Sequence, residues 1–189
     1  VTIRGYKSIS YEHPVTLHLG DVSILLGANG AGKSNLISFF RMLSYMMSSS
    51  FGRYVEMNGT SNALLYYGAK KTPAISANMA FSDRNSTSEY TFTLTNASPD
   101  RLIITEERIL WRKDGEESPY IAVMEPNFKE TSLKDSEDRI AQSIFRTLSF
   151  CKVYQFHDTS SEGPLRQSCP VETANYLQSK GNNLPSFLL

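Results

Sequence analysis

A glycine-rich loop that ends in lysine and serine is the segment of this sequence best suited to chemistry. Residues 27–34 read GANGAGKS and match the pattern G-x-x-x-x-G-K-[ST] at every fixed position. Gly27, Gly30 and Gly32 allow a tight turn, and backbone N–H groups can approach phosphate oxygens because no Cβ stands in the way. The sequence therefore predicts a loop that binds the phosphates of a nucleotide, with ATP and Mg²⁺ as the expected ligands.

The residues at the end of the loop have defined roles in this prediction. The helix that begins after Gly32 adds the positive end of its dipole to the loop, which also contains Ala31. Lys33 reaches the β- and γ-phosphates, and the Ser34 hydroxyl is a ligand of Mg²⁺. Because the whole pattern is matched in its expected context, we prefer this interpretation to an ordinary glycine-rich turn that caps a helix.

The elements around the loop occur in the order that a phosphate loop requires. Residues 22–26 form a short apolar run, which is typical of a strand covered on both faces. From Lys33 to Met47 the apolar residues have helical spacing, whereas residues 1–9 and 15–19 alternate and predict two antiparallel strands. Strand, glycine loop and helix therefore follow one another along the chain.

The rest of the chain is predicted to be an antiparallel meander followed by helices. Alternating apolar residues predict strands at about residues 73–124, and Asp114-Gly115 predicts a hairpin turn between two of them. The segment before the meander, 48–72, reads as irregular with one short helix near 61–67. Further predicted elements are a helix at about 136–149 capped by Ser136, a strand at 151–156, a short helix at about 171–180 and a last helix opened by Leu184-Pro185.

Composition and charge narrow the class of protein. The 189 residues include 19 Lys and Arg and 19 Asp and Glu, so the net charge is zero and gives no electrostatic support for non-specific DNA binding. Cys151 and Cys169 lack C-x-x-C spacing and are predicted to be free thiols. The sequence shows no signal peptide and no run of 18 apolar residues, which predicts a cytoplasmic protein without a membrane partner.

Several stretches resemble a known family of ATPases. Residues 1–9 (VTIRGYKSI) and 25–37 (LLGANGAGKSNLI) are similar to the N-terminal lobe of ABC-type ATPases of the SMC/RecF-like branch, in which a G-[FY]-[KR]-S-like strand precedes a G-x-N-G-x-G-K-[ST]-N loop. This branch includes the ATPase halves of overcoming-lysogenization-type nucleases and related anti-phage proteins. Residues 154–160 and 181–188 also resemble these ATPases. Neither N-K-x-D nor D-x-x-G occurs in the sequence, which argues against a GTPase.

The resemblance implies a fold and an arrangement of domains. The fold would be α/β, an α+β lobe of the P-loop NTPase class of ABC/RecF-like type, with a mixed sheet, the loop helix and the antiparallel meander. Residues 1–158 would form the N-terminal ATP-binding lobe, and residues 159–189 the start of a truncated helical second lobe. The apolar residues at both ends of the sequence agree with the expectation that it is part of a longer protein.

The resemblance also implies further residues at the nucleotide site. Arg4, Lys7 and Ser8 would lie beside the nucleotide, with Lys7 and Ser8 near the ribose and the phosphates. Asn29 and Asn35 would flank the phosphates, Asn29 from within the loop. A solvated lysine at the end of a surface strand remains the alternative for Lys7.

The family has a Q-loop that senses Mg²⁺ and the γ-phosphate, and its position corresponds to residues 155–158. Gln155 would then be a second metal ligand, although strand alternation would point His157 at the site instead. A plain polar loop is the third alternative. Two short stretches only imitate other motifs of the family. Residues 102–107 (LIITEE) imitate a Walker B strand inside the meander, and residues 161–163 (SEG) imitate a signature motif but precede a proline.

The resemblance places the Walker B and signature motifs beyond residue 189. We therefore expect an ATP-binding lobe that hydrolyses ATP only in a full-length head-to-tail dimer, while this segment alone is inactive. The dimer would act in DNA repair, DNA processing or phage defence, through DNA or an associated nuclease. One alternative is a transporter-type ABC ATPase subunit, in which Tyr6 or Tyr11 would stack on adenine. The other is a nucleotide-gated scaffold without turnover.

Overall fold

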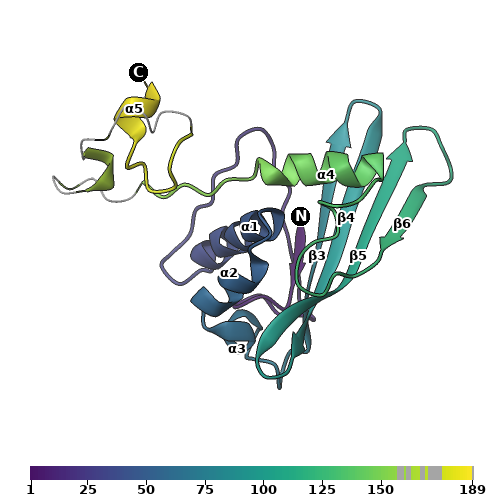
Figure 1. Cartoon of the computed structure of the whole chain (residues 1–189), viewed down its shortest axis with the longest axis horizontal. Helices are drawn as coiled ribbons and strands as arrows, with labels where there is room; N and C mark the ends of the chain where they lie inside the picture. Colours follow the sequence, from purple (N-terminus) through teal and green to yellow (C-terminus); the bar gives the residue numbers. More distant parts are fainter. Residues whose placement is uncertain (157–159, 161–162, 167–168, 170–175, 189) are drawn as a thin grey trace. The chain divides into compact units, whose positions relative to one another are not determined.

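A computed structural model describes residues 1–156, 160, 163–166, 169 and 176–188. The chain divides into two compact units, Val1–Cys151 and Lys152–Leu189. The second unit contains a short 3-10 helix, η1 (Pro164–Arg166), and the helix α5 (Leu184–Leu188). The first unit is an α+β domain (Figure 1) that contains β1 (Thr2–Arg4), β2 (Val15–Thr16), α1 (Lys33–Met47), α2 (Phe51–Met57), α3 (Thr60–Leu64), β3 (Ala74–Asp83), β4 (Ser86–Ala97), β5 (Arg101–Lys113), β6 (Tyr120–Met124) and α4 (Arg139–Ser149).

A six-stranded sheet forms the centre of the first unit, with the strand order β2-β1-β3-β4-β5-β6. Every neighbouring pair is antiparallel, and the predicted antiparallel pair before the loop and the predicted meander are both confirmed. Along β4 the buried residues Tyr90, Phe92 and Leu94 alternate with the half-buried threonines 91, 93 and 95. Because successive side chains of a strand point to opposite faces, one face of the sheet is apolar and the other is polar.

Helices cover the apolar face of this sheet. Phe39 of α1 stacks on Phe92 of β4, with ring centroids 6.4 Å apart, and α4 contacts both β4 and β5. The buried residues of α1, which include Met42 and Met46, recur at the helical period that the sequence shows. The predicted helix after the glycine loop is therefore confirmed, and its packing fixes the end of the helix that carries Lys33 to the rigid sheet.

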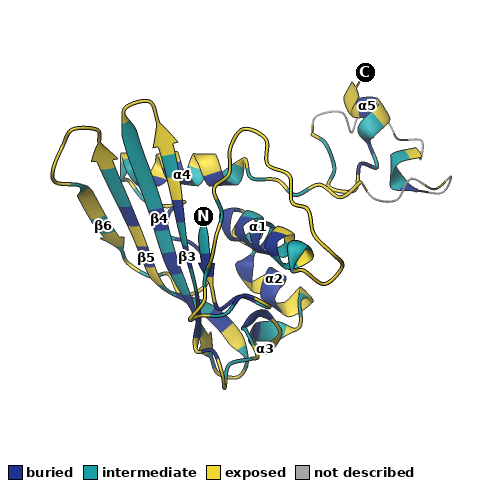
Figure 2. Cartoon of the chain, turned by 180° about the vertical axis from the view of Figure 1, so that it is seen from behind, coloured by how far each residue is buried: buried dark blue, intermediate teal, exposed yellow. Residues whose placement is uncertain are grey.

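The predicted strand at residues 22–26 is wrong. The segment contains no strand, and Val22, Ile24 and Leu26 are 83%, 78% and 89% exposed. Figure 2 shows the long connection between β2 and α1 as exposed. Both sides of β1 are already occupied, by β2 and β3, so the centre of the sheet has no free edge for another strand. The expected mixed sheet of a P-loop NTPase is also wrong, because each pair of neighbouring strands is antiparallel and the first unit shows only an α+β fold.

Several other boundaries differ from the prediction. The helix predicted from Ser136 begins at Arg139 instead, because the Asp138 carboxylate accepts hydrogen bonds from the backbone N–H groups of Ile140 and Ala141 and caps the helix. Helix α2 forms where irregular structure was expected, and α3 lies close to the short helix predicted near 61–67. Residues 151–156 form no strand. The predicted helix at 171–180 falls partly outside the described residues, and residues 176–180 are not helical, whereas the predicted last helix is confirmed as α5.

Candidate functional site

Two of the three glycines in the loop have a left-handed backbone conformation. Gly30 and Gly32 have φ values of 86° and 89°, in the left-handed region that glycine adopts without a steric penalty. Gly32 is also the N-cap of α1, where no side chain caps the helix and no acidic residue lies in the first turn. The N–H of Asn35 already donates to the carbonyl of Gly32, whereas the N–H groups of Lys33 and Ser34, at the start of this 15-residue helix, remain available to an anion.

Lys33 places its positive charge at the loop itself. Its ammonium group donates hydrogen bonds to the carbonyl oxygens of Gly27, at 2.5 Å, and of Ala28, at 2.7 Å. The loop backbone is also closed by a hydrogen bond from the N–H of Ala31 to the carbonyl of Ala28. The ammonium can exchange these carbonyl oxygens for phosphate oxygens, because both are hydrogen-bond acceptors and only the side chain has to move.

The N-terminal segment meets the start of α1, as the sequence suggested. The side-chain amide of Asn35 donates a hydrogen bond of 2.8 Å to the hydroxyl of Ser8. A Cβ on Gly32 would lie 3.4 Å from the same hydroxyl. Ser8, Gly32 and Asn35 are therefore brought together, while Ser34 and Asn29 are exposed on the same loop and helix turn.

Arg4 and Tyr6, which also belong to the N-terminal segment, are directed elsewhere. The guanidinium of Arg4 donates to the carbonyl oxygen of Tyr11 at 3.3 Å. Tyr6 is fully buried, and its hydroxyl is hydrogen-bonded to Ser38 at 2.5 Å and to Tyr54 at 2.9 Å. Burial, together with the neighbouring Tyr54, raises the pKa of Tyr6 far above its ordinary value. Tyr6 therefore belongs to the core and cannot stack on a ligand.

Two backbone hydrogen bonds join the N-terminal segment to the chain after α3. The N–H of Lys7 donates to the carbonyl of Leu64 at 2.8 Å, and the N–H of Tyr66 donates to the carbonyl of Gly5 at 2.9 Å. Lys7 has a φ of 49°, which is uncommon for a residue with a Cβ. Partial burial, and to a smaller extent the charge of Arg41, lower the pKa of the Lys7 ammonium.

A hollow of about 780 Å³ lies where these segments meet. Its size is within the range of about 300–1,000 Å³ that is usual for small-molecule sites. It shares Lys7, Ser8 and Asn35 with the predicted nucleotide site, whereas its opposite wall was not predicted. That wall consists of Asn62, Ala63, Leu65, Tyr66, Tyr67 and Gly68. The only sequence signal for it was a pair of tyrosines before a glycine.

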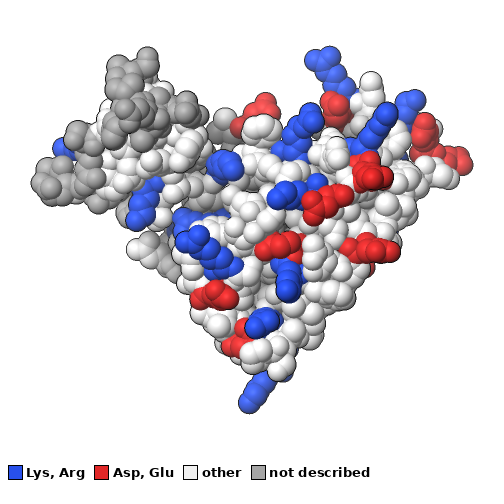
Figure 3. Space-filling view, in the orientation of Figure 1, with Lys and Arg blue, Asp and Glu red and all other residues white. Residues whose placement is uncertain are grey.

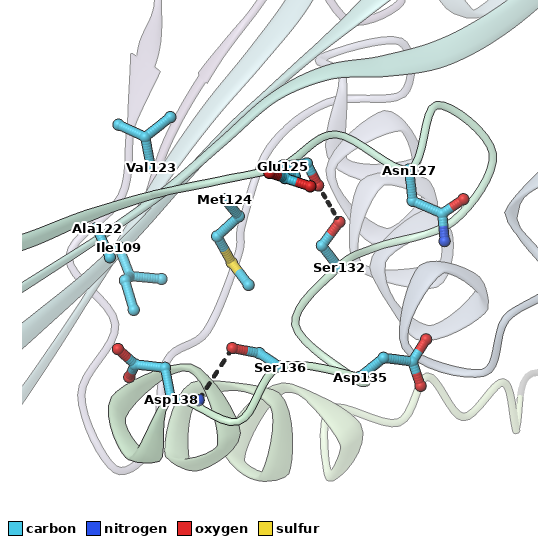
Figure 4. A pocket seen from close by; sticks show the side chains of 10 residues that line it. All are labelled: Ile109, Ala122, Val123, Met124, Glu125, Asn127, Ser132, Asp135, Ser136 and Asp138. Atoms are coloured by element: carbon cyan, nitrogen blue, oxygen red, sulfur yellow. Dashed lines mark hydrogen bonds between the residues drawn. The ribbon is translucent and has the colours of Figure 1, made fainter.

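A second hollow, of about 330 Å³, lies between β6 and the start of α4. In Figure 4 the Met124 side chain projects from the strand toward α4, and Asp138 and Ser136 lie on the helix side. The polar groups that Figure 4 joins are already paired, because Ser132 donates to the carbonyl of Glu125 and the N–H of Asp138 donates to Ser136. This hollow shares no lining residue with the glycine loop.

The imitation of a Walker B strand at residues 102–107 has a structural role. Glu107 is fully buried, and its carboxylate accepts hydrogen bonds from Thr131 at 2.6 Å and from the N–H of Ser132 at 2.7 Å. The hydroxyl of Tyr90 also donates to this carboxylate. These bonds fasten the loop before α4 to the sheet and leave Glu107 no access to a ligand.

Only two of the four residues predicted for a Q-loop, Gln155 and Phe156, are described by the structure. Gln155 belongs to the second unit, where its backbone N–H donates to the carbonyl of Ser179 at 2.8 Å. His157 and two residues of the SEG stretch, Ser161 and Glu162, lie outside the described residues. The role of Gln155 at the metal stays a prediction.

The Ser34 hydroxyl is the group of the loop that the motif predicts as a metal ligand. Among the residues that the structure describes, no group of three or more His, Cys, Asp or Glu side chains is arranged to hold a metal. Mg²⁺ at phosphate sites needs only one or two protein oxygens, because phosphate oxygens and water complete its octahedron. The exposed Ser34 hydroxyl fits such a role.

Surface charge and membrane propensity give no further site. Acidic and basic side chains lie among one another on the face shown in Figure 3, as expected for a chain with zero net charge. In the part of the chain that the structure describes, no helix is long and apolar enough to cross a membrane.

Comparisons with protein-family models, with curated proteins and with solved structures found no match to this chain.

Proposed function

We propose that this chain binds Mg-ATP through residues 27–34 and is the ATP-binding lobe of an SMC/RecF-like ABC-type ATPase. One observation carries the proposal. In a complete G-x-x-x-x-G-K-[ST] loop, the left-handed Gly32 precedes Lys33 and opens a long helix that has no side-chain cap. This combination offers backbone N–H groups, a helix dipole and an ammonium group to one anion.

Each residue of the loop would have one task in binding. The N–H groups of the loop and of the first turn of α1 would hold the phosphates, and Lys33 would leave the carbonyls of Gly27 and Ala28 to contact the β- and γ-phosphates. Ser34 would provide its hydroxyl to Mg²⁺. Asn35 and Ser8, which are already hydrogen-bonded to each other, would lie along the part of the ligand that leaves the loop.

Hydrolysis would require groups that lie outside this part of the chain. Among the described residues, no carboxylate forms a hydrogen bond or an ion pair with Lys33 or Ser34, so none is placed to orient the attacking water. We propose that a second lobe, in a head-to-tail dimer with a second copy, provides these groups. The exposed apolar segment 22–26 would pack against that lobe, since exposed apolar patches next to a site commonly mark an interface.

Two alternative functions, a transporter-type subunit and a scaffold without turnover, make different demands on the residues near the loop. A transporter-type subunit would need an aromatic residue before the loop to stack on adenine. Tyr6 is buried, so only Tyr11 remains for that role. A scaffold that binds ATP without turnover would use the same phosphate loop and would differ in having no hydrolytic group in its second lobe. We propose that the assembled ATPase, and not this lobe alone, works in the cytoplasm and contacts DNA or a nuclease. The charges of this lobe are balanced, so they give no electrostatic support for DNA binding by the lobe itself.

Titration of the purified chain with ATP, with and without Mg²⁺, tests the proposal. We expect Lys33→Ala to weaken binding by about 10- to 100-fold, because a hydrogen bond to a charged group contributes about 1.5–3 kcal/mol. Lys129→Ala is the matched control, because Lys129 is an exposed lysine outside the loop and outside the hollow. Equal affinities of Lys33→Ala and the wild type would refute the proposal.

A further inference from the structure

We infer that the hollow beside the glycine loop is a nucleobase subsite in which Tyr67 stacks on the base with little discrimination among bases. This inference rests on the proposed binding of a nucleotide by residues 27–34 and adds to it the part of the ligand that the loop does not reach. The glycine loop recognises phosphates alone, so the contribution of the base depends on what lies next to Ser8 and Asn35.

Continuity between the loop and the hollow is the first argument. Ser8 lies 3.4 Å from a Cβ placed on Gly32, is hydrogen-bonded to Asn35, and lines the hollow together with Asn35. A ligand with its phosphates at the start of α1 therefore extends directly across Ser8 and Asn35. Lys7, on the same wall, adds a cation beside the ribose or the α-phosphate.

The aromatic wall opposite these residues is the second argument. Tyr67 is 79% exposed although it is a large aromatic residue, and it lines the hollow. Tyr66 packs against it edge to face, with ring centroids 4.6 Å apart and an interplanar angle of 78°. Tyr67 has a φ of 55°, and such backbone conformations occur often at binding sites. Because Tyr67 is largely exposed and lines the hollow, its ring is accessible to a flat ring system.

The backbone that carries this wall is held firmly, which limits the entropy lost on stacking. Thr72 is buried and donates its hydroxyl to the carbonyl of Tyr66 at 2.6 Å. The N–H of Ala69 donates to the side-chain oxygen of Asn62 at 3.0 Å. This approach requires glycine at position 68, because a Cβ there would lie 3.1 Å from that oxygen and φ is 79°. The tyrosines are therefore displayed on a preorganised loop.

The hydrogen bonds of two lining side chains favour weak discrimination among bases. Asn62 uses both ends of its amide within the protein, since it accepts from Ala69 and donates to Asp100 at 3.1 Å. One of the two amide N–H groups of Asn35 is used by Ser8. A site discriminates strongly only where polar groups are built to pair with its ligand. Stacking on Tyr67 works for any base, because every base has a π-face.

Affinity measurements with ATP, GTP and inorganic tripolyphosphate, all with Mg²⁺, test the inference. For the wild-type chain we expect ATP and GTP to bind with similar affinity. Tyr67→Ala should weaken both by about 5- to 100-fold, the usual loss for one stacked base. The affinity for tripolyphosphate should not change, because it has no base. Tyr67→Phe should bind like the wild type, since it keeps the ring.

Controls separate this inference from the proposed function. Tyr120→Ala removes another exposed tyrosine of the same unit, outside the hollow, and should leave all three affinities unchanged. Normal affinity for ATP in Tyr67→Ala, together with lost binding in Lys33→Ala, would overturn the subsite and leave the phosphate loop intact. An equal loss for tripolyphosphate in Tyr67→Ala would overturn stacking as the cause, and a strong preference for ATP over GTP would overturn base tolerance. If Lys33→Ala changed none of the three affinities, the proposed function itself would be refuted.

Discussion

The side-chain amide of Asn35, in the first turn of α1, donates a hydrogen bond of 2.8 Å to the hydroxyl of Ser8, 27 residues earlier in the chain. This bond joins the helix that begins at the glycine loop to the segment that follows β1. It also lies at the boundary between the loop and the larger hollow. The two ends of the proposed nucleotide site are therefore connected through one pair of polar side chains.

We predict that Ser8 and Asn35 act on nucleotide affinity as a pair. Ser8→Ala and Asn35→Ala should each weaken the binding of Mg-ATP by about two- to tenfold, the value of one ordinary hydrogen bond. The double variant should lose no more than the larger single loss, because each substitution already removes the shared bond. Titrations of the three variants measure this, with Asn85→Ala in the β3–β4 turn as a control. Additive losses would contradict the prediction.

Phe39 should be among the residues of α1 that contribute most to stability. Its buried ring stacks on Phe92 of β4 and meets Tyr6 edge to face, with centroids 5.7 Å apart. Phe39→Ala should lower the free energy of unfolding by about 3–5 kcal/mol, because it removes a large buried side chain and leaves a cavity. Ile37→Ala on the exposed side of the same helix should change it by less than about 0.5 kcal/mol. Urea denaturation compares the two, and similar losses would argue against the packing of α1 on the sheet.

The buried tyrosines predict a loss of stability at alkaline pH. Burial, and in addition the nearby Glu107, raise the pKa of Tyr90. Burial also raises the pKa of Tyr6. Both phenols stay neutral in the folded chain but lose a proton near pH 10 when it unfolds. The contribution of these tyrosines to the free energy of unfolding should be constant below about pH 9 and fall above pH 10, by up to about 1.4 kcal/mol per pH unit for each tyrosine. Denaturation curves from pH 8 to 11 measure the slope, which Tyr90→Phe should reduce. An unchanged slope in that variant would disprove the role of Tyr90.

Asp100 should titrate well below an ordinary aspartate. Hydrogen bonds from Ser61 and from Thr60, the latter at 2.5 Å, lower the pKa of Asp100 to about 2. The carboxylate therefore keeps its contacts with the start of α3 at neutral pH, and they are lost only as the pH falls from about 4 through about 2. Carbon NMR of the Asp100 carboxyl group measures this value, and Ser61→Ala should raise it. Titration near 4 in the wild-type chain would contradict the hydrogen bonds.

Much of the sheet was predictable because its signal is local. In β4, threonines alternate with Tyr90, Phe92 and Leu94, and this period of two needs no knowledge of the partner strands. Helix α2 was not predictable in this way. It forms in a segment rich in serine and glycine because Phe51, Tyr54 and Val55 become buried, and such tertiary packing outweighs a weak local preference.

The candidate site, like the fold, was predictable only in part. The glycine loop and the approach of Ser8 to α1 followed from a continuous motif and a family resemblance. The hollow did not, because its walls come from segments about 60 residues apart that are joined by backbone hydrogen bonds, such as that from the N–H of Lys7 to the carbonyl of Leu64. Backbone groups are the same in nearly every residue, so no pattern of side chains in the sequence indicates that these two segments are hydrogen-bonded to each other.

The exposed segment 22–26 also has a consequence for handling the protein. Val22, Ile24, Leu25 and Leu26 form an uncharged, β-prone window without proline, and all four are exposed. Windows of this kind promote aggregation when no partner covers them. Recovery of the isolated chain should therefore fall steeply with concentration, and a charged substitution such as Ile24→Lys should improve it without lowering the melting temperature. The residues that lead into the phosphate loop thus also set the yield at which it can be studied.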